Sequence, residues 1–298
     1  MEKYGKQRPV EDDKTDPSGF LKKAREHQSK FRLEKLHLND YAEYGNYLTI
    51  SDAQNGNNFY NGFDIFSAVK DYRKFNNDLY QNMLRSEHIP FNLFIPLNAN
   101  KTYSQNVFNE ILNGKIKSIN LQKIEYAPRP IRNYLNDKTS FDAYIEYTSN
   151  DGKNGIVGIE TKYTELSYKI GKKEKTEMDD LESIYYIITN RSNAYKDESI
   201  PKLKEDDYRQ IWRNHLLGES ILLKDPDKFH SFTSITFYPG KNEHFQKVSK
   251  EYKSFLKKEY KNKCLFITYE ELFELLIKYC PDNKYKKWIG YLNSRYII

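Results

Sequence analysis

The chain has 298 residues, of which 38% are hydrophobic and 30% charged, and its 48 basic and 42 acidic side chains leave a net charge of +6. This length accommodates one large domain, or one core with a smaller accessory part, and the basic excess fits a polyanionic partner without establishing one. No apolar stretch approaches the ~18 residues that a membrane span requires, and the start lacks the apolar segment of a signal peptide, so we expect a cytoplasmic protein with no membrane contact.

The first hundred residues predict helices and loops. Residues 1–17 are charged and lack apolar periodicity, which predicts a mobile tail. Amphipathic helices are expected from Phe20 to Leu36 and from Phe63 to Arg85, with loop and turns over residues 41–62 between them. We therefore assign residues 18–100 to an N-terminal helical part that packs on the core.

Two short segments lead from this part into the core. The apolar run of residues 89–97 is bracketed by prolines and predicts a buried connection. A short helix is expected over residues 104–112, with Gly114 as its cap.

Residues 101–298 carry the pattern of an α/β core. Strands are expected over residues 119–126, 141–147 and 156–163, and Asp-Gly and Asn-Gly pairs between the last two favour an antiparallel hairpin. The later segments alternate between helices and strands: helices at 177–188 and 206–223, a strand at 231–238, a helix at 243–261, a strand at 264–269, and helices at 270–279 and 285–296. Together these segments predict a mixed sheet flanked by helices.

The hairpin also carries candidate catalytic residues. Asp142 begins its first strand and Glu160 stands near the end of its second, so antiparallel pairing brings both carboxylates to the same end of the sheet. Glu160 and Lys162 share a side because strand side chains alternate, which leaves Thr161 to offer its carbonyl. Two carboxylates and a carbonyl are hard oxygen ligands that suit Mg²⁺. Lys162 beside the ion could orient a water molecule and offset charge as a phosphodiester is attacked.

The Glu-x-Lys triplet alone is a weak signal. Residues 251–253 and 259–261 match it as well, but both lie in a predicted helix where acidic and basic residues alternate on the solvent face. The copy at Glu160 instead follows an apolar strand. A structural Glu–Lys pair at the sheet edge is the alternative interpretation.

The same hairpin resembles a known family. Residues 140–147, 151–153 and 155–165 (SFDAYIEY, DGK and GIVGIETKYTE) resemble the active-site hairpin of the PD-(D/E)XK nuclease superfamily. Ser86-Glu87 before residues 92–97 (NLFIPL) is similar to a bacterial restriction-endonuclease-like branch of it. That branch also has a Gln-x-Trp-Arg-x-His helix, matched here by Gln210, Trp212, Arg213 and His215.

The resemblance covers roughly residues 75 to 295 and departs from the superfamily pattern in having Phe141, not Pro, before Asp142. It implies a restriction-endonuclease-like α/β core with one or two Mg²⁺ ions, for which Mn²⁺ can substitute. Asp142 and Glu160 would hold the metal, and Lys162 would be the catalytic lysine.

Further candidates surround this core. Glu87 could supply another metal-binding carboxylate, and the alternative is that Glu87 is a surface residue near a helix end. Glu110 is the competing candidate for this third carboxylate. Gln210, Arg213 and Asn214 share a helix side. We expect Gln210 to hold Lys162 or a phosphate as part of the catalytic set, and Arg213 and Asn214 to contact nucleic acid; helix-to-sheet hydrogen bonding is the alternative.

Basic residues in two loops are candidates for contacts with the nucleic-acid backbone. Arg129 and Arg132 precede Asp142 in a Pro-bounded loop, and Lys172 and Lys173 belong to a basic, mobile loop after the hairpin. Such residues give affinity through phosphates and carry no base information.

The hypothesis that follows is an Mg²⁺-dependent endonuclease acting on DNA, double-stranded by preference, in restriction, phage defence or repair. A homodimer is expected from the resemblance. The alternative is a catalytically inactive protein of the same fold that binds nucleic acid or serves as a scaffold in a defence complex. RNA stays open as a substrate, because a metal site of this type contacts a phosphodiester that both polymers share.

Overall fold

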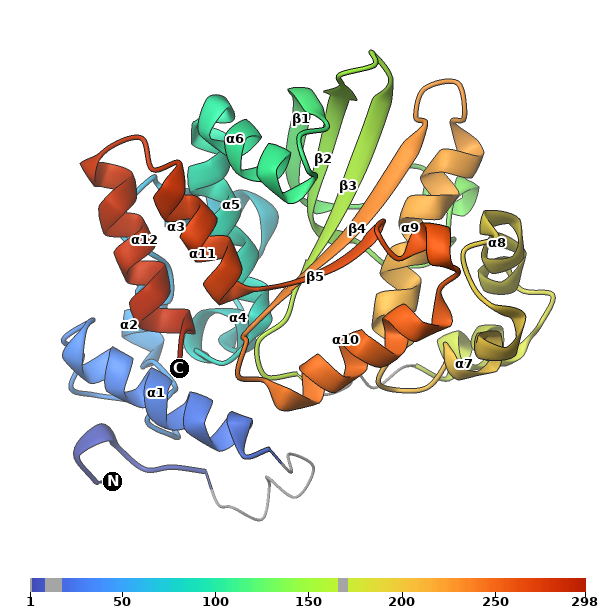
Figure 1. Ribbon diagram of the computed structural model, residues 1–298. Helices are drawn as coiled ribbons and strands as arrows, with labels where there is room; N and C mark the ends of the chain where they lie inside the picture. The colour runs from blue at the N-terminus through green and yellow to red at the C-terminus, as the bar shows by residue number, and fades with distance from the viewer. Residues whose placement is uncertain (1, 9–17, 166–170) are drawn as a thin grey trace.

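The computed structural model describes residues 2–8, 18–165 and 171–298, and its centre is a five-stranded sheet with helices on both faces (Figure 1). The strands, in sheet order, are β1 (Ile116–Tyr126), β2 (Phe141–Ser149), β3 (Asn154–Thr161), β4 (Ser231–Tyr238) and β5 (Cys264–Thr268). The pairs β1–β2 and β2–β3 are antiparallel, whereas β3–β4 and β4–β5 are parallel. The predicted mixed sheet flanked by helices is therefore confirmed.

The hairpin of β2 and β3 has the predicted antiparallel register. Thr148 pairs with Asn154 next to the turn, and Ala143 pairs with Ile159 at the far end. Gly152 in the turn has φ +82°, a conformation that glycine adopts without strain. β3 is the central strand and is buried on both faces over nearly its whole length, as its apolar sequence indicates.

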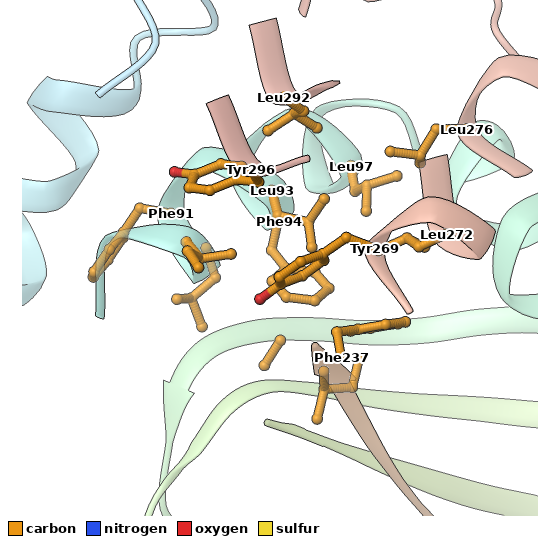
Figure 2. Close-up of a cluster of buried hydrophobic side chains, with 14 of the residues drawn as sticks. Phe91, Leu93, Phe94, Leu97, Phe237, Tyr269, Leu272, Leu276, Leu292 and Tyr296 are labelled. Carbon is orange, nitrogen blue, oxygen red and sulfur yellow. The ribbon is translucent and has the colours of Figure 1, made fainter. Parts of the chain in front are cut away.

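One face of the sheet is covered by α5 (Ile89–Ala99), α6 (Lys101–Ile111), α11 (Tyr269–Lys278) and α12 (Asn283–Tyr296). Figure 2 shows the core on this side, where Phe94 and Leu97 of α5 meet Tyr269 and Leu272 of α11 above Phe237 of the sheet. The opposite face carries α7 (Lys172–Asp179), α8 (Ile184–Ser192), α9 (Arg209–Lys224) and α10 (Glu243–Phe255). Alternate residues of each strand supply the two cores.

The N-terminal part adds α1 (Phe20–Glu34), α2 (Ile50–Gln54), α3 (Ile65–Tyr72) and α4 (Asn77–Gln81). α1 lies against the C-terminal end of α12 (Figure 1), where Gln28 donates to the carbonyl of Arg295 and to the hydroxyl of Tyr163. Within the predicted tail, Gln7 donates to Ser29 of α1, so residues 2–8 are attached to the domain; residues 1 and 9–17 lie outside the described residues.

The single helix predicted over residues 63–85 is wrong. α3 ends at Tyr72, and residues 73–76 run as an irregular segment before Asn76 caps α4 by accepting from the backbone N–H of Leu79. Apolar residues recur at helical spacing on both sides of this break, because both helices bury one face against the same core.

The buried connection predicted over residues 89–97 is a helix, α5. Pro90 stands in its first turn, where its missing N–H costs no hydrogen bond. Pro96 lies inside the helix and cannot donate to the carbonyl of Asn92. The indole N–H of Trp288 in α12 donates to that carbonyl instead, at 2.7 Å. A contact with a distant helix therefore compensates for the proline.

Three further boundaries differ from the predictions. The structure has two helices, α7 and α8, where one helix was expected over residues 177–188. Lys172 begins α7, so the end of the predicted mobile loop is helical. Residues 166–170 of that loop lie outside the described residues. α10 ends at Phe255, because Leu256 turns away to bridge Tyr195. A short helix, α2, interrupts the predicted loop over residues 41–62.

The two cysteines are free thiols, of which Cys264 is buried and Cys280 is partly buried. Among the helices of the described residues, none has both the length and the apolar character needed to cross a membrane.

Candidate active site

Asp142 and Glu160 lie side by side at one end of the sheet, as the hairpin register requires, since Ala143 pairs with Ile159. Oδ2 of Asp142 accepts from the backbone N–H and from the hydroxyl of Thr161, both at 2.7 Å. These two bonds hold the Asp142 carboxylate toward the third strand. Oδ2 of Asp142 is therefore directed to the backbone of β3. The structure also has Asp142 and Glu160 next to each other, as the sequence predicts.

Phe141 explains how β2 begins without the proline of the superfamily pattern. Its ring is buried and lies over Gly158 of β3, where an added Cβ would stand 2.3 Å from a ring atom. The glycine thus makes room for the aromatic ring. Packing between neighbouring strands fixes the backbone immediately before Asp142.

Lys162 and Glu160 form a buried ion pair. Nζ of Lys162 lies 2.8 Å from Oε1 of Glu160, and the two side chains are only 5% and 8% exposed. Lys162 also donates to Oε1 of Gln210 at 2.6 Å, and Nε2 of Gln210 donates back to Glu160 at 2.7 Å. Asn214 donates to the second Glu160 oxygen at 2.5 Å. A buried charge pair of this kind persists only when its remaining polar atoms are satisfied, and α9 supplies both amides.

The backbone around Lys162 is held from several elements. Its N–H donates to the carbonyl of Phe237 in β4, and its carbonyl accepts from the hydroxyl of Tyr269 in α11 at 2.9 Å. Three residues after Lys162, Glu165 accepts from the backbone N–H of Ser86 at 2.7 Å. This last bond ties the segment that carries Glu87 to the residues that follow β3.

A cavity of about 210 Å³ opens in front of these residues. Asp142 and Glu160 line it, together with Glu87 and with Arg73 and Glu125, which the sequence did not indicate. Glu125 stands near the end of β1 with φ +53°, and Arg73 follows α3; their ion pair measures 2.7 Å. A positive φ at a residue that is not glycine has no clear sequence signal, and Arg73 fell within a helix predicted to be continuous.

The cavity concentrates negative charge. Burial raises the pKa of Asp142 well above its usual range, and the nearby Glu160 and Glu125 carboxylates raise it further. Burial also raises the pKa of Glu125; Arg73 opposes this, while Glu160 and Glu87 add to it. A cation placed among these oxygens would favour their charged forms.

The donor set fits a divalent ion that prefers oxygen. Within the described ranges, no three acidic, histidine or cysteine side chains converge on one point, so protein carboxylates alone would not complete the coordination. Mg²⁺ commonly binds one or two carboxylates and keeps water and substrate oxygens in its other positions. Asp142 and Glu160 meet that requirement, with Glu87 on the cavity wall.

Of the other candidate residues, some lie at the cavity and others do not. Arg213 lines the cavity and binds Asp137 through two hydrogen bonds of 3.0 and 2.8 Å. Asn214 is buried and engaged with Glu160, so the geometry favours a positioning role over the predicted contact with nucleic acid. Glu110 lies on α6 and pairs with Lys278 of α11, so it is not brought to the site.

The remaining basic candidates lie outside the cavity. Arg129 is exposed and lines a larger neighbouring groove, and Arg132 is exposed in a short 3-10 helix before β2. Lys172 is exposed at the start of α7. The Lys173 side chain lies outside the described part of the molecule. Trp212 and His215 of α9 are buried in the core.

A comparison with protein families supports the resemblance. The model of the PD-(D/E)XK nuclease superfamily matches residues 11–298, nearly the whole chain. No match is found among curated proteins or among solved structures.

Proposed function

Because the chain belongs to the PD-(D/E)XK nuclease superfamily, we propose that it is an endonuclease that hydrolyses DNA phosphodiester bonds with a divalent metal ion, Mg²⁺ by preference. The observation that carries this proposal is the set of Asp142, Glu160 and Lys162 at one end of the hairpin, with the lysine bound to Glu160 and Gln210. Restriction, phage defence or repair is the proposed context.

The proposed roles follow from the geometry. Asp142 and Glu160 would hold the metal, aided by the carbonyl of Thr161 and by Glu87. The ion would lower the pKa of an attacking water and offset the charge that the phosphate gains. Lys162 would orient that water and add positive charge beside the phosphate.

Residues of α9 position this machinery. Gln210 holds the ammonium of Lys162 through one amide atom and Glu160 through the other, which limits the rotation of both side chains. Arg213, held by Asp137, would present its guanidinium to a phosphate at the cavity wall.

Nucleic acid is the proposed partner, and we propose that basic residues bind it through its phosphate backbone. Arg129, Arg132, Lys172 and Lys173 are the candidates for these contacts. A double-strand break needs two cleavage events, so we also propose that two copies of the chain act together.

Incubation of the purified protein with supercoiled plasmid tests the proposal. We expect Mg²⁺ or Mn²⁺ to support nicking or linearisation, and EDTA, Asp142→Ala and Lys162→Ala each to abolish it. Lys261→Ala is the matched control, because Lys261 closes another Glu-x-Lys triplet but is exposed and precedes β5, at the end of the sheet opposite Glu160. Full activity in Lys162→Ala would refute the assigned site. Salt-sensitive DNA binding without cleavage would instead favour the inactive, nucleic-acid-binding alternative.

A further inference from the structure

A second and larger groove lies directly beside the catalytic cavity. Its volume is about 960 Å³, at the upper end of the roughly 300–1,000 Å³ of sites that hold small organic molecules. It is lined by the end of β1, by the end of α3 with Arg73 after it, and by the loop between β1 and β2. The groove and the cavity share Arg73, Glu125, Lys138 and Ser140. A chain of nucleotides that reaches the catalytic carboxylates can therefore continue into the groove.

Two exposed aromatic rings lie at or near this groove. Tyr72, the last residue of α3, lines the groove and is 49% exposed, and Phe75, in the irregular segment that follows α3, is 42% exposed. Among all described residues, these are the two aromatic side chains that remain exposed, although the chain contains 26 Tyr and 17 Phe. The other aromatic rings that the structure describes are buried or half-buried.

Both rings are held by core residues. The Tyr72 ring contacts the buried Phe91 with centroids 5.7 Å apart, and the Phe75 ring contacts the buried Tyr80 at 4.8 Å. A ring fixed on one side and open on the other is suited to stack on a flat partner, because little side-chain entropy is lost on binding.

The charge balance of the groove favours a polyanion. Its carboxylates at Glu125 and Asp137 are already paired with Arg73 and Arg213. Asp71 is the remaining acid on the lining. Three basic residues of the lining have no carboxylate partner among the described residues: Lys123, Arg129 and Lys138.

We propose that the groove binds an unpaired stretch of a nucleic-acid strand next to the scissile phosphate, with Tyr72 stacking on a base and the three basic residues contacting phosphates. Bases within a duplex are stacked on each other, so only unpaired bases offer a free face to a ring. The inference rests on the proposed nuclease function and specifies its substrate. The preferred DNA has a single-stranded segment, such as an overhang or a flap, beside the cleaved bond.

Binding measurements on matched oligonucleotides test this inference. Fluorescence anisotropy, with the Lys162→Ala protein and Mg²⁺, would compare a single strand, a blunt duplex and a duplex with an overhang. The single strand would be made both as DNA and as RNA. 2-Aminopurine in the unpaired segment would report stacking. The variants are Tyr72→Ala and, as the matched control that keeps the ring, Tyr72→Phe, each checked for an unchanged melting temperature.

We expect Tyr72→Ala to weaken binding of the single strand and of the overhang substrate by roughly ten-fold or more, as loss of one stacked base does, and to abolish 2-aminopurine quenching. Binding of the blunt duplex should change little, and Tyr72→Phe should behave as the parent protein does. Equal effects of Tyr72→Ala on all substrates, or none, would overturn the inference while plasmid cleavage still upheld the nuclease. Absence of both binding and cleavage with every substrate would overturn the inference and the proposed function together.

Discussion

At the residue scale, Asp142 shows a conflict between stability and the proposed chemistry. Its carboxylate is held by Thr161 in a cavity that it shares with Glu160 and Glu125, and burial and these neighbours raise its pKa. In the metal-free protein, the charged form of Asp142 is therefore unfavourable. Residues that bind metal commonly lower the stability of the empty site in this way.

Asp142→Asn should stabilise the metal-free protein, because the amide oxygen can still accept from Thr161 while the buried charge is removed. We expect the melting temperature without metal to rise by about 2–4 °C, the change that ~1 kcal/mol produces in a chain of moderate size. Mg²⁺ should raise the melting temperature of the wild type and leave that of the variant unchanged. Calorimetry with and without EDTA measures both effects; a variant that still responds to Mg²⁺ would exclude Asp142 as a ligand.

Gln210→Ala tests whether α9 positions Lys162. Loss of the amide removes one acceptor from the lysine and one donor from Glu160, so both side chains gain freedom. We expect kcat for plasmid nicking to fall by roughly 10- to 100-fold, the size of effect that misplacement of a catalytic group produces, with little change in KM. A purely structural role would lower the melting temperature without this separation of kcat from KM.

At the scale of elements, two strands and one helix place the proposed catalytic groups. β2 and β3 bring Asp142 to Glu160 through their register, and α9 crosses behind them with Gln210 and Asn214 directed at Glu160. The contact between Phe141 and Gly158 sets how closely the two strands pack near Asp142 and Glu160.

Gly158→Ala should therefore disturb both fold and site. The new Cβ would lie 2.3 Å from the Phe141 ring, a distance that requires the ring or strand to move. We expect a loss of about 1–3 kcal/mol in the free energy of unfolding, as overpacking causes, together with lower nuclease activity. Gly290→Ala is the matched control: its Cβ would meet nothing within 4 Å in α12, so stability should rise by up to ~1 kcal/mol. Urea unfolding compares the two, and a neutral Gly158→Ala would contradict the argument.

At the scale of the whole molecule, the first and last parts of the chain share one core with the sheet. His88 lies at this junction, with Nε2 3.1 Å from the carbonyl of Met83 and Nδ1 3.1 Å from the hydroxyl of Tyr296 in α12. A carbonyl only accepts, so Nε2 carries the proton and Nδ1 accepts from Tyr296. Burial lowers the pKa of His88 well below its usual range, and the nearby Arg295 lowers it further.

This shift makes stability depend on pH in a defined direction. The unfolded chain takes up a proton at His88 below about pH 6.5, whereas the folded chain does not, so stability is present above that pH and lost as the pH falls. From pH 7.5 to 5.5, we expect His88 to contribute a loss of about 1.4 kcal/mol. His88→Gln should show a shallower slope than the wild type. Urea unfolding at several pH values gives the slope of unfolding free energy against pH for each protein. Contributions of other titrating groups cancel in the difference between the two slopes, and equal slopes would contradict a neutral buried His88.

Local patterns in the sequence were sufficient to predict the five strands, the antiparallel hairpin and the position of Asp142, Glu160 and Lys162 at one end of the sheet. These features depend on residues close in sequence, through two-residue alternation and turn chemistry. The link from Gln210 to Lys162 was also anticipated, because helical spacing showed which side chains of that helix share a face.

Tertiary structure alone decided the rest. The run over residues 89–97 is helical because Trp288, almost 200 residues away, satisfies the carbonyl that Pro96 leaves unpaired. Arg73 reaches the cavity because the chain breaks between α3 and α4, and Glu125 reaches it with a positive φ near the end of β1. Both depend on how distant elements pack, and no local pattern of apolar and polar residues encodes that packing.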